Sequence, residues 1–349
     1  MANPADHDNR TPSERDNTGR PRTHSMPGSA TAQRAKRQAL QKYTLAAVLL
    51  CFCLVLAMLA VMLVGGIIAN SSDDDKGQGS HDMKWGEKSV AVSDTQQGPL
   101  ILVNDQHAYT FPSNTANLAK ISDVFSQNPE HPYEPSGLLG GLMDRDALTA
   151  MDTMLTDFKA ATGTDDVRIL YAYRSYEDQK ELSDNNPSAQ KPGYSDHHTG
   201  YGVNMNHMKN GTPYALNEAP YTWIAENCHK YGFIVRYPSD KKDKTGVEYD
   251  DYFRYVGIPH ATYMKENNLC MEEYVELLKS KTYKKPLEFQ GTDGNKYCVY
   301  YAAVSSGGTT VNYPTNYAYT MSGTNEGGVV ITVNLSSTSG NTEADTSAS

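Results

Sequence analysis

The 349 residues of this chain are enough for one or two folded domains with appended segments. A formal net charge of −10 at pH 7 makes nucleic acid and anionic lipid poor partners. The five cysteines lack the spacing of a zinc knuckle and do not indicate a disulfide framework. We expect Cys228, Cys270 and Cys298 to be buried thiols, with a Cys270–Cys298 bridge as the alternative.

The N-terminal third predicts a membrane anchor. Residues 1–43 are polar and rich in Ser, Pro and Arg, which predicts a disordered leader. Residues 44–69 carry no charge over 26 positions, and about 20 apolar residues suffice to cross a bilayer. Basic residues precede this run and three aspartates (73–75) follow it, so we expect a cytoplasmic leader and an extracellular remainder. A cleaved signal peptide is the alternative, but its apolar core would be only about 7–15 residues long.

The next segments predict an α+β domain. Residues 70–96 are hydrophilic and predict a linker. The apolar run at 98–105 predicts a strand, as does "VRILYAY" at 167–173. Residues 146–163 predict a helix whose apolar side chains share one face, with an Asp at its start and Gly163 at its end.

Two further helical segments precede a β-rich region. A helix is expected over 220–231, and a second over 259–280 with a break near Asn267 and Asn268. Residues 285–335 contain Tyr- and Val-rich strands between Gly-rich turns and predict a β module. Its tyrosines favour strand packing, with a sugar-stacking platform as the alternative. The tail, 336–349, predicts disorder.

Five sequence blocks, in order, resemble the VanY-type D-alanyl-D-alanine carboxypeptidases. The resemblance covers residues 97–282 and implies the Hedgehog/DD-peptidase-like fold: a small mixed or antiparallel sheet with packed helices. It also implies a zinc peptidase that trims the peptide stems of bacterial cell-wall precursors. The blocks are "YRSYEDQ" (173–179), "PGYSDHHTGYGVNM" (192–205), "WIAENCHKYGFIVRYP" (223–238), "KTGV" (244–247) and "FRYVG" (253–257).

The resemblance assigns three metal positions, and two of them are altered. His197 stands at the first ligand position. Asn204 occupies the place of the family's Asp, and Tyr252 the place of its second His. An amide supplies only a neutral carbonyl oxygen, and a tyrosine, with a reference pKa of about 10, binds metal well only as phenolate. Zinc is therefore expected to be weak or absent here.

The substrate-binding positions of the family are retained. Arg174 matches the arginine that pairs with the terminal carboxylate of the substrate, supported by Ser175 and Gln179. Ser195 is also in its place, two residues before His197.

The position of the general base does not hold the family's glutamate. It falls at Tyr249 when counted back from "FRYVG", and at Asp250, a doubtful base, when counted forward from "TGV".

A rearranged metal site is the alternative. His207 and the carboxylates Asp196, Asp250 and Asp251 lie close in sequence, whereas His198 should face away from His197 on a strand. The other two histidines of the matching blocks are expected to be structural: His229 and His260.

The sequence thus predicts a membrane-anchored, cell-wall-facing member of this peptidase family. It is expected to bind or act on peptidoglycan stem peptides ending in D-Ala-D-Ala, with zinc hydrolysis impaired or lost, or to regulate a cell-wall enzyme partner. An active zinc carboxypeptidase with a rearranged metal site is one alternative. A scaffold that binds through its C-terminal β module is the other.

Overall fold

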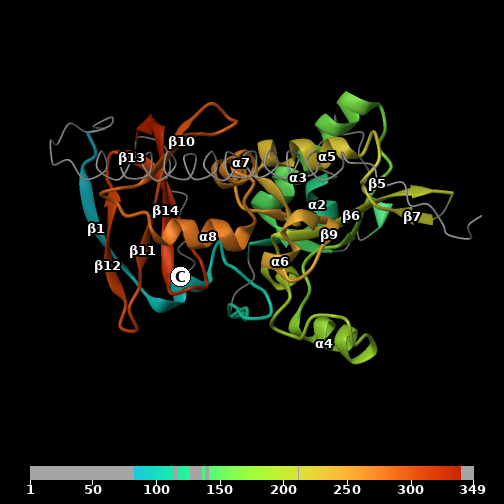
Figure 1. Cartoon of the computed structure of the whole chain (residues 1–349), viewed down its shortest axis with the longest axis horizontal. Helices are drawn as coiled ribbons and strands as arrows, with labels where there is room; N and C mark the ends of the chain where they lie inside the picture. The colour runs from blue at the N-terminus through green and yellow to red at the C-terminus, as the bar shows by residue number, and fades with distance from the viewer. Residues whose placement is uncertain (1–81, 114–116, 126–135, 138–140, 211, 339–349) are drawn as a thin grey trace, which may run out of the picture. The chain divides into compact units, whose positions relative to one another are not determined.

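The computed structural model describes residues 82–113, 117–125, 136–137, 141–210 and 212–338 (Figure 1). The predicted leader and the predicted membrane span at 44–69 lie outside these residues, as does most of the predicted tail. No helix in the described ranges has the length and apolar character needed to cross a membrane. The described residues all belong to one compact unit.

A six-stranded mixed sheet forms the centre of the N-terminal part of this unit. The strand order is β3-β5-β6-β9-β8, with β7 paired to the end of β6. β3 and β5 are parallel and the other pairs are antiparallel, which confirms the predicted mixed sheet. The strands are β3 (Ser136–Gly137), β5 (Val167–Tyr171), β6 (Gly202–Lys209), β7 (Thr212–Tyr214), β8 (Phe233–Tyr237) and β9 (Tyr249–Tyr255).

The long helix α3, Arg145–Thr162, confirms the predicted helix. The Asp144 carboxylate caps it by accepting hydrogen bonds from the backbone N–H groups of Asp146 and Ala147. Gly163 ends it in the left-handed conformation, where a side chain would be strained. Its predicted apolar face is fully buried against the sheet and neighbouring helices: Leu148, Met151, Leu155 and Phe158.

Shorter helices complete the domain. The helix expected over 220–231 is shorter than predicted, because α5 (Thr222–Asn227) passes into a 3-10 turn at Cys228–Tyr231. The expected break near Asn267 is confirmed, since α7 and α8 are separate helices. The remaining helices are α2 (Ile121–Phe125), α4 (Tyr176–Asn185), α6 (Lys242–Thr245), α7 (Ile258–Glu266) and α8 (Met271–Lys279).

The C-terminal strands form an antiparallel sheet in the order β10-β11-β14-β13. A separate two-stranded ribbon pairs β12 (Thr309–Pro314) with β1 (Trp85–Val90), more than 200 residues earlier in the chain (Figure 1). The sheet strands are β10 (Leu287–Gln290), β11 (Lys296–Ala303), β13 (Tyr317–Gly323) and β14 (Gly328–Thr338).

Two predictions for the segment before residue 105 are wrong. The predicted linker contains β1 and a 3-10 helix at Val92–Gln96. The side chains of β1 are mostly exposed, so its composition resembles that of a linker although its backbone is paired. The strand predicted at 98–105 is instead irregular chain, whose apolar residues Leu100 and Leu102 are buried between the two parts of the unit.

The β sheet and the N-terminal domain share a hydrophobic core. Leu100, Tyr274 on α8 and Val299 on β11 belong to one buried cluster. His260 on α7 connects the parts further, because its ring nitrogens lie 2.8 Å from the Tyr274 hydroxyl and 3.0 Å from the Thr332 hydroxyl. The three described cysteines are buried and unbridged, as expected, so the alternative bridge between Cys270 and Cys298 is excluded.

A glycine substitution tests whether the 3-10 helix is part of the folded unit. A side chain at Gly323 on β13 would collide with the backbone of Thr95. We expect Gly323→Ala to lower the free energy of unfolding by about 1–3 kcal/mol, the usual cost of overpacking. Gly307→Ala is the matched control, because a methyl group there meets no atom within 4 Å, and its effect should stay within about 0.5 kcal/mol. Urea unfolding measures both; equal effects would contradict the packing described.

Candidate functional site

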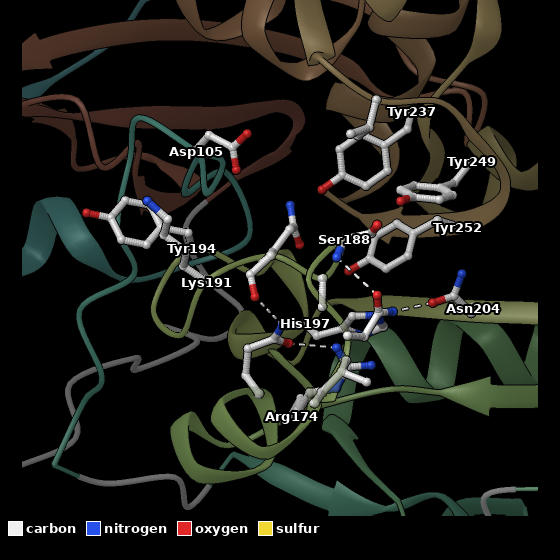
Figure 2. A pocket seen from close by; sticks show the side chains of 16 residues that line it. Asp105, Arg174, Ser188, Lys191, Tyr194, His197, Asn204, Tyr237, Tyr249 and Tyr252 are labelled. Carbon is white, nitrogen blue, oxygen red and sulfur yellow. Dashed lines mark hydrogen bonds between the residues drawn. The ribbon is translucent and has the colours of Figure 1, made fainter. Parts of the chain in front are cut away.

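A polar pocket of about 690 Å³ opens beside the central sheet (Figure 2). Its wall combines the loop at Asp105, the start and end of α4, the loop before His197, and strands β6, β8 and β9. The lining residues are Asp105, Arg174, Gln179, Leu182, Asn186, Ser188, Ala189, Gln190, Lys191, Tyr194, His197, Asn204, Tyr237, Val247, Tyr249 and Tyr252.

Arg174 is the positioned cation of this pocket. It follows β5, and its Nη1 donates a 2.7 Å hydrogen bond to Oε1 of the buried Gln179. The Gln179 amide in turn donates to the Gln190 carbonyl oxygen at 2.6 Å, which fixes the orientation of the arginine. Burial lowers the pKa of Arg174, but an arginine stays charged at neutral pH. Among the described residues no carboxylate pairs with it, so a ligand carboxylate can take that place.

The two predicted serines do not line the pocket. Ser175 is the N-cap of α4: its hydroxyl accepts from the Asp178 N–H and donates to the Asp178 carboxylate at 2.7 Å. Ser175 therefore orders the start of the helix that follows Arg174. The Ser195 hydroxyl is buried and has no hydrogen-bond partner among the described residues.

His197 lies at the floor of the pocket in a 3-10 turn, Asp196–Thr199. Its Nδ1 is 2.7 Å from the Ala172 carbonyl oxygen and its Nε2 is 3.1 Å from Asn204 Oδ1. Burial, with the nearby Arg174 charge, lowers the pKa of His197 to about 3, so the ring is neutral. A neutral ring has one N–H and can donate to only one of these oxygens, unless the Asn204 amide is turned so that its nitrogen faces Nε2.

The structure brings the three predicted metal positions together. Asn204 on β6 and Tyr252 on β9 are direct partners in the sheet register. The Tyr252 ring meets the His197 ring edge to face, with centroids 4.8 Å apart. The Tyr252 hydroxyl, however, donates a 2.9 Å hydrogen bond to Asp196 Oδ2. Burial raises the pKa of Tyr252 well above its usual value, so the phenol keeps its proton.

The neighbouring histidines do not supply a replacement ligand. His198 Nδ1 donates to the Arg174 carbonyl oxygen at 2.6 Å, and its Nε2 accepts from the Gly193 N–H at 3.0 Å. Both nitrogens are therefore occupied away from His197, as expected, but the strand expected here is wrong, because both histidines lie in the 3-10 turn Asp196–Thr199. His207 is three positions beyond Asn204 on β6, hence on the other face, and stacks on Tyr221 with centroids 3.8 Å apart. His207, offered by the sequence as a ligand of a rearranged metal site, therefore does not reach this pocket.

The predicted base positions are also unsuited to proton transfer. Tyr249 lies at the pocket rim with half of its side chain exposed, and it is a phenol where the family has a carboxylate. Asp250 is exposed and does not line the pocket. Asp251, whose carboxyl receives a hydrogen bond from Asn204 and has a pKa raised by burial, is the acidic side chain that contacts the altered ligand.

A buried ion network lies beneath the pocket and was not predicted from the sequence. Its centre is Asp196, which receives the Tyr252 hydroxyl and a close charge-assisted hydrogen bond from Arg254 Nη1. Arg236 Nε lies 3.8 Å from the same carboxylate and pairs through both terminal nitrogens with Glu272 on α8, at 2.9 and 2.7 Å. The alternation of inward and outward side chains along β8 and β9 could have indicated that Arg236 and Arg254 point inward. It could not have indicated that both approach one carboxylate.

Comparison with known proteins identifies the family. Residues 141–258 match the family profile described as VanY, D-alanyl-D-alanine carboxypeptidase. A D-alanyl-D-alanine carboxypeptidase of Enterococcus faecium is 32% identical over 256 residues, covering 71% of this chain and 78% of the relative. The chain belongs to the VanY family.

One solved structure supports the fold. The vancomycin-resistance D,D-dipeptidase VanXYg, solved with a D-Ala-D-Ala phosphinate analogue, has a TM-score of 0.61. It is 24% identical, and the match covers 72% of this chain and 99% of VanXYg. A VanY D,D-pentapeptidase mutant from a VanB-type cassette, solved with Zn(II), is 28% identical with a TM-score of 0.37, over 51% of this chain and 98% of that protein.

The donor set of this pocket does not fit the zinc of the VanY family. His197 offers one nitrogen, Asn204 a neutral oxygen, and Tyr252 a phenol whose proton is held by Asp196. Catalytic zinc sites use three His, Cys or carboxylate ligands and an open fourth position. Across the described part of the chain, no three His, Cys, Asp or Glu side chains gather closely enough to hold a metal ion.

Two buried tyrosines of the pocket wall provide a matched stability test. Tyr252→Phe removes one hydrogen bond to the buried Asp196 carboxylate, and we expect it to cost about 1–3 kcal/mol. Tyr237→Phe removes a buried hydroxyl that has no partner among the described residues, so stability should be unchanged or slightly higher. Urea unfolding of both variants checks this; equal losses would show that the Tyr252–Asp196 bond is not what stabilises this wall.

Proposed function

We propose that this chain is a VanY-family protein that binds the D-Ala-D-Ala end of peptidoglycan stem peptides without hydrolysing them. The observation that carries the proposal is that one pocket keeps the family's peptide-binding residues but not its metal-binding residues. The cation that would recognise a peptide carboxylate is retained and held in place, whereas the ligands that would hold zinc are replaced.

The binding half rests on Arg174. The two hydrogen bonds that run from Arg174 through Gln179 to Gln190 orient the guanidinium towards the pocket. Figure 2 shows Arg174 among the side chains that line the cavity. Charged hydrogen bonds with a carboxylate of fixed geometry give both affinity and a preference for a free chain end.

The loss of hydrolysis rests on the metal and base positions. Hydrolysis by the family needs a metal-bound water and a carboxylate that removes its proton. Here Asn204 and Tyr252 stand at two of the three ligand positions, and Tyr249 stands at the base position. These replacements leave a chamber that can hold a peptide end without the zinc ligands and the base that the family uses.

We also propose that residues 44–69 anchor the chain in the cell membrane with the described domain outside the cell. The uncharged run of 26 residues and the basic flank before it support this orientation. Such a location would bring the pocket to cell-wall peptides.

Peptide titration of the purified chain tests the proposed binding. A pentapeptide ending in D-Ala-D-Ala should bind, and Arg174→Gln should weaken it by about 10–100-fold, the value of a charged hydrogen-bonded pair. A C-terminally amidated peptide should bind the unaltered chain as weakly as the free acid binds the variant. Arg145→Gln, an exposed arginine at the start of α3, is the control and should change nothing. If the unaltered chain binds the free-acid peptide and the amidated peptide with equal affinity, Arg174 does not recognise the terminal carboxylate.

The same samples test hydrolysis. With zinc added, the chain should release no D-alanine from the pentapeptide, and metal analysis should find no stoichiometric zinc. Zinc-dependent release of D-alanine would falsify the proposed function and support the alternative of an active enzyme with a rearranged site.

A repair experiment tests the assignment of the metal positions. The double variant Asn204→Asp with Tyr252→His restores the family's donors beside His197. Mutating residues that only hydrogen-bond to zinc ligands already lowers metal affinity by about 10–100-fold. Restoring two ligands should therefore raise zinc affinity by at least about 100-fold over that of the unaltered chain. Asn204→Asp alone, which leaves two donors, is the control and should gain much less. Competition with a chromogenic chelator measures the affinity, and circular dichroism confirms folding. No gain in the double variant would mean that these positions are misassigned.

A further inference from the structure

A second, smaller cleft lies in the C-terminal β region, apart from the pocket of Arg174. It has a volume of about 230 Å³ and lies between strand β11, strand β12 and the turn at Thr282–Lys285. Strand β1 borders it through its pairing with β12. Its lining residues are Thr282, Tyr283, Tyr300, Tyr301, Ala302, Thr309, Thr310, Val311 and Asn312.

Aromatic rings form the rigid part of this cleft. The Tyr300 ring is buried, and its hydroxyl donates a 2.7 Å hydrogen bond to the Asn312 carbonyl oxygen, which fixes β11 against β12. Trp85 on β1 packs edge to face on both Tyr283 and Tyr300, with centroids 5.5 and 6.0 Å apart. Tyr283 lines the cleft and is 36% exposed. Trp85 is not one of the lining residues, but it is 39% exposed beside Tyr283, so part of each ring is available to a ligand at the mouth of the cleft.

The remaining lining is polar but carries no charge. The Thr310 hydroxyl and the Asn312 amide lie on the same face of β12 and have no side-chain hydrogen-bond partner among the described residues. None of the nine lining residues is charged at neutral pH, and Lys284 lies over the Tyr283 ring, 5.7 Å from its centroid. The Arg174 pocket differs in this respect, because Arg174, Lys191 and Asp105 line it.

The lining residues and the volume of the cleft indicate what kind of ligand would fit it. A neutral lining excludes an ion as the preferred occupant, because an ion would lose its water without gaining a countercharge. A sugar ring has an apolar C–H face, which packs against an aromatic ring, and an edge of hydroxyl groups, which need donors and acceptors such as Thr and Asn. The volume is too small for a drug-sized molecule, whose sites are about 300–1,000 Å³, but suits a single ring.

We propose that this cleft binds one sugar ring of a neutral glycan chain, with Trp85 and Tyr283 as the stacking residues and Thr310 and Asn312 as the polar contacts. The choice of an N-acetylhexosamine glycan, the kind found in cell-wall strands, rests on the proposed function. The chain then holds a glycan and a peptide end at separate sites.

Calorimetric titration of the full chain with an N-acetylglucosamine hexamer tests the proposal. Binding is expected, and Trp85→Ala and Tyr283→Ala should each weaken it about tenfold, as truncation of an aromatic contact does. Tyr214→Ala is the matched control, because Tyr214 is 45% exposed but lies on β7 of the other sheet. That variant should bind as the unaltered chain does.

The outcomes separate this proposal from the peptide site. Arg174→Gln should leave the affinity for the hexamer unchanged and lower the affinity for the D-Ala-D-Ala peptide. Each proposed site can therefore be disproved without affecting the other. The absence of hexamer binding, or binding that survives both aromatic substitutions in folded protein, overturns the glycan site. Because Trp85 and Tyr283 are partly exposed, both variants should fold, and a cooperative thermal transition verifies this.

Discussion

The buried carboxylate of Asp196 is the constraint on which the pocket depends. It receives hydrogen bonds from Arg254 and Tyr252, and Arg236 lies beside it. A buried charge is tolerated only when its hydrogen-bonding capacity is met, and removing one partner is strongly destabilising. Arg254 also donates to the Pro99 and Ile101 carbonyl oxygens, at 3.0 and 3.1 Å, so the network holds the segment before the domain against the sheet.

This network also determines what the substitution at position 252 does. Tyr252 contributes its ring to the wall beside His197 and its hydroxyl to Asp196. The residue at this predicted ligand position thus has a structural partner of its own. Replacing Tyr252 with histidine would supply a nitrogen for a metal ion. The same replacement would remove the hydrogen bond that the Tyr252 hydroxyl donates to Asp196. The VanY-family fold and the Arg174 pocket are therefore present here together with Asn204 and Tyr252 at the two predicted ligand positions.

Two sites of different chemistry lie in one continuous folded unit. The Arg174 pocket is polar and charged, and the aromatic cleft near β11 is neutral. The buried cluster between α8 and β11 joins the elements that carry them, so the β region is not an appendage with a separate core. Ligands of the two sites, as proposed, are the two components of one polymer, the peptide stem and the glycan strand.

The sequence by itself determined the elements whose signal is local: helix α3 with its Asp cap and Gly163, the break near Asn267, and the ordered motifs that place His197, Asn204 and Arg174. Tertiary structure alone decided the rest. The pairing of β1 with β12, the opposite face taken by His207, and the gathering of Asp196 with two arginines all join residues distant in the chain or depend on strand register. Local composition carries no record of such partners, because a paired edge strand and a solvated linker expose the same kinds of side chain.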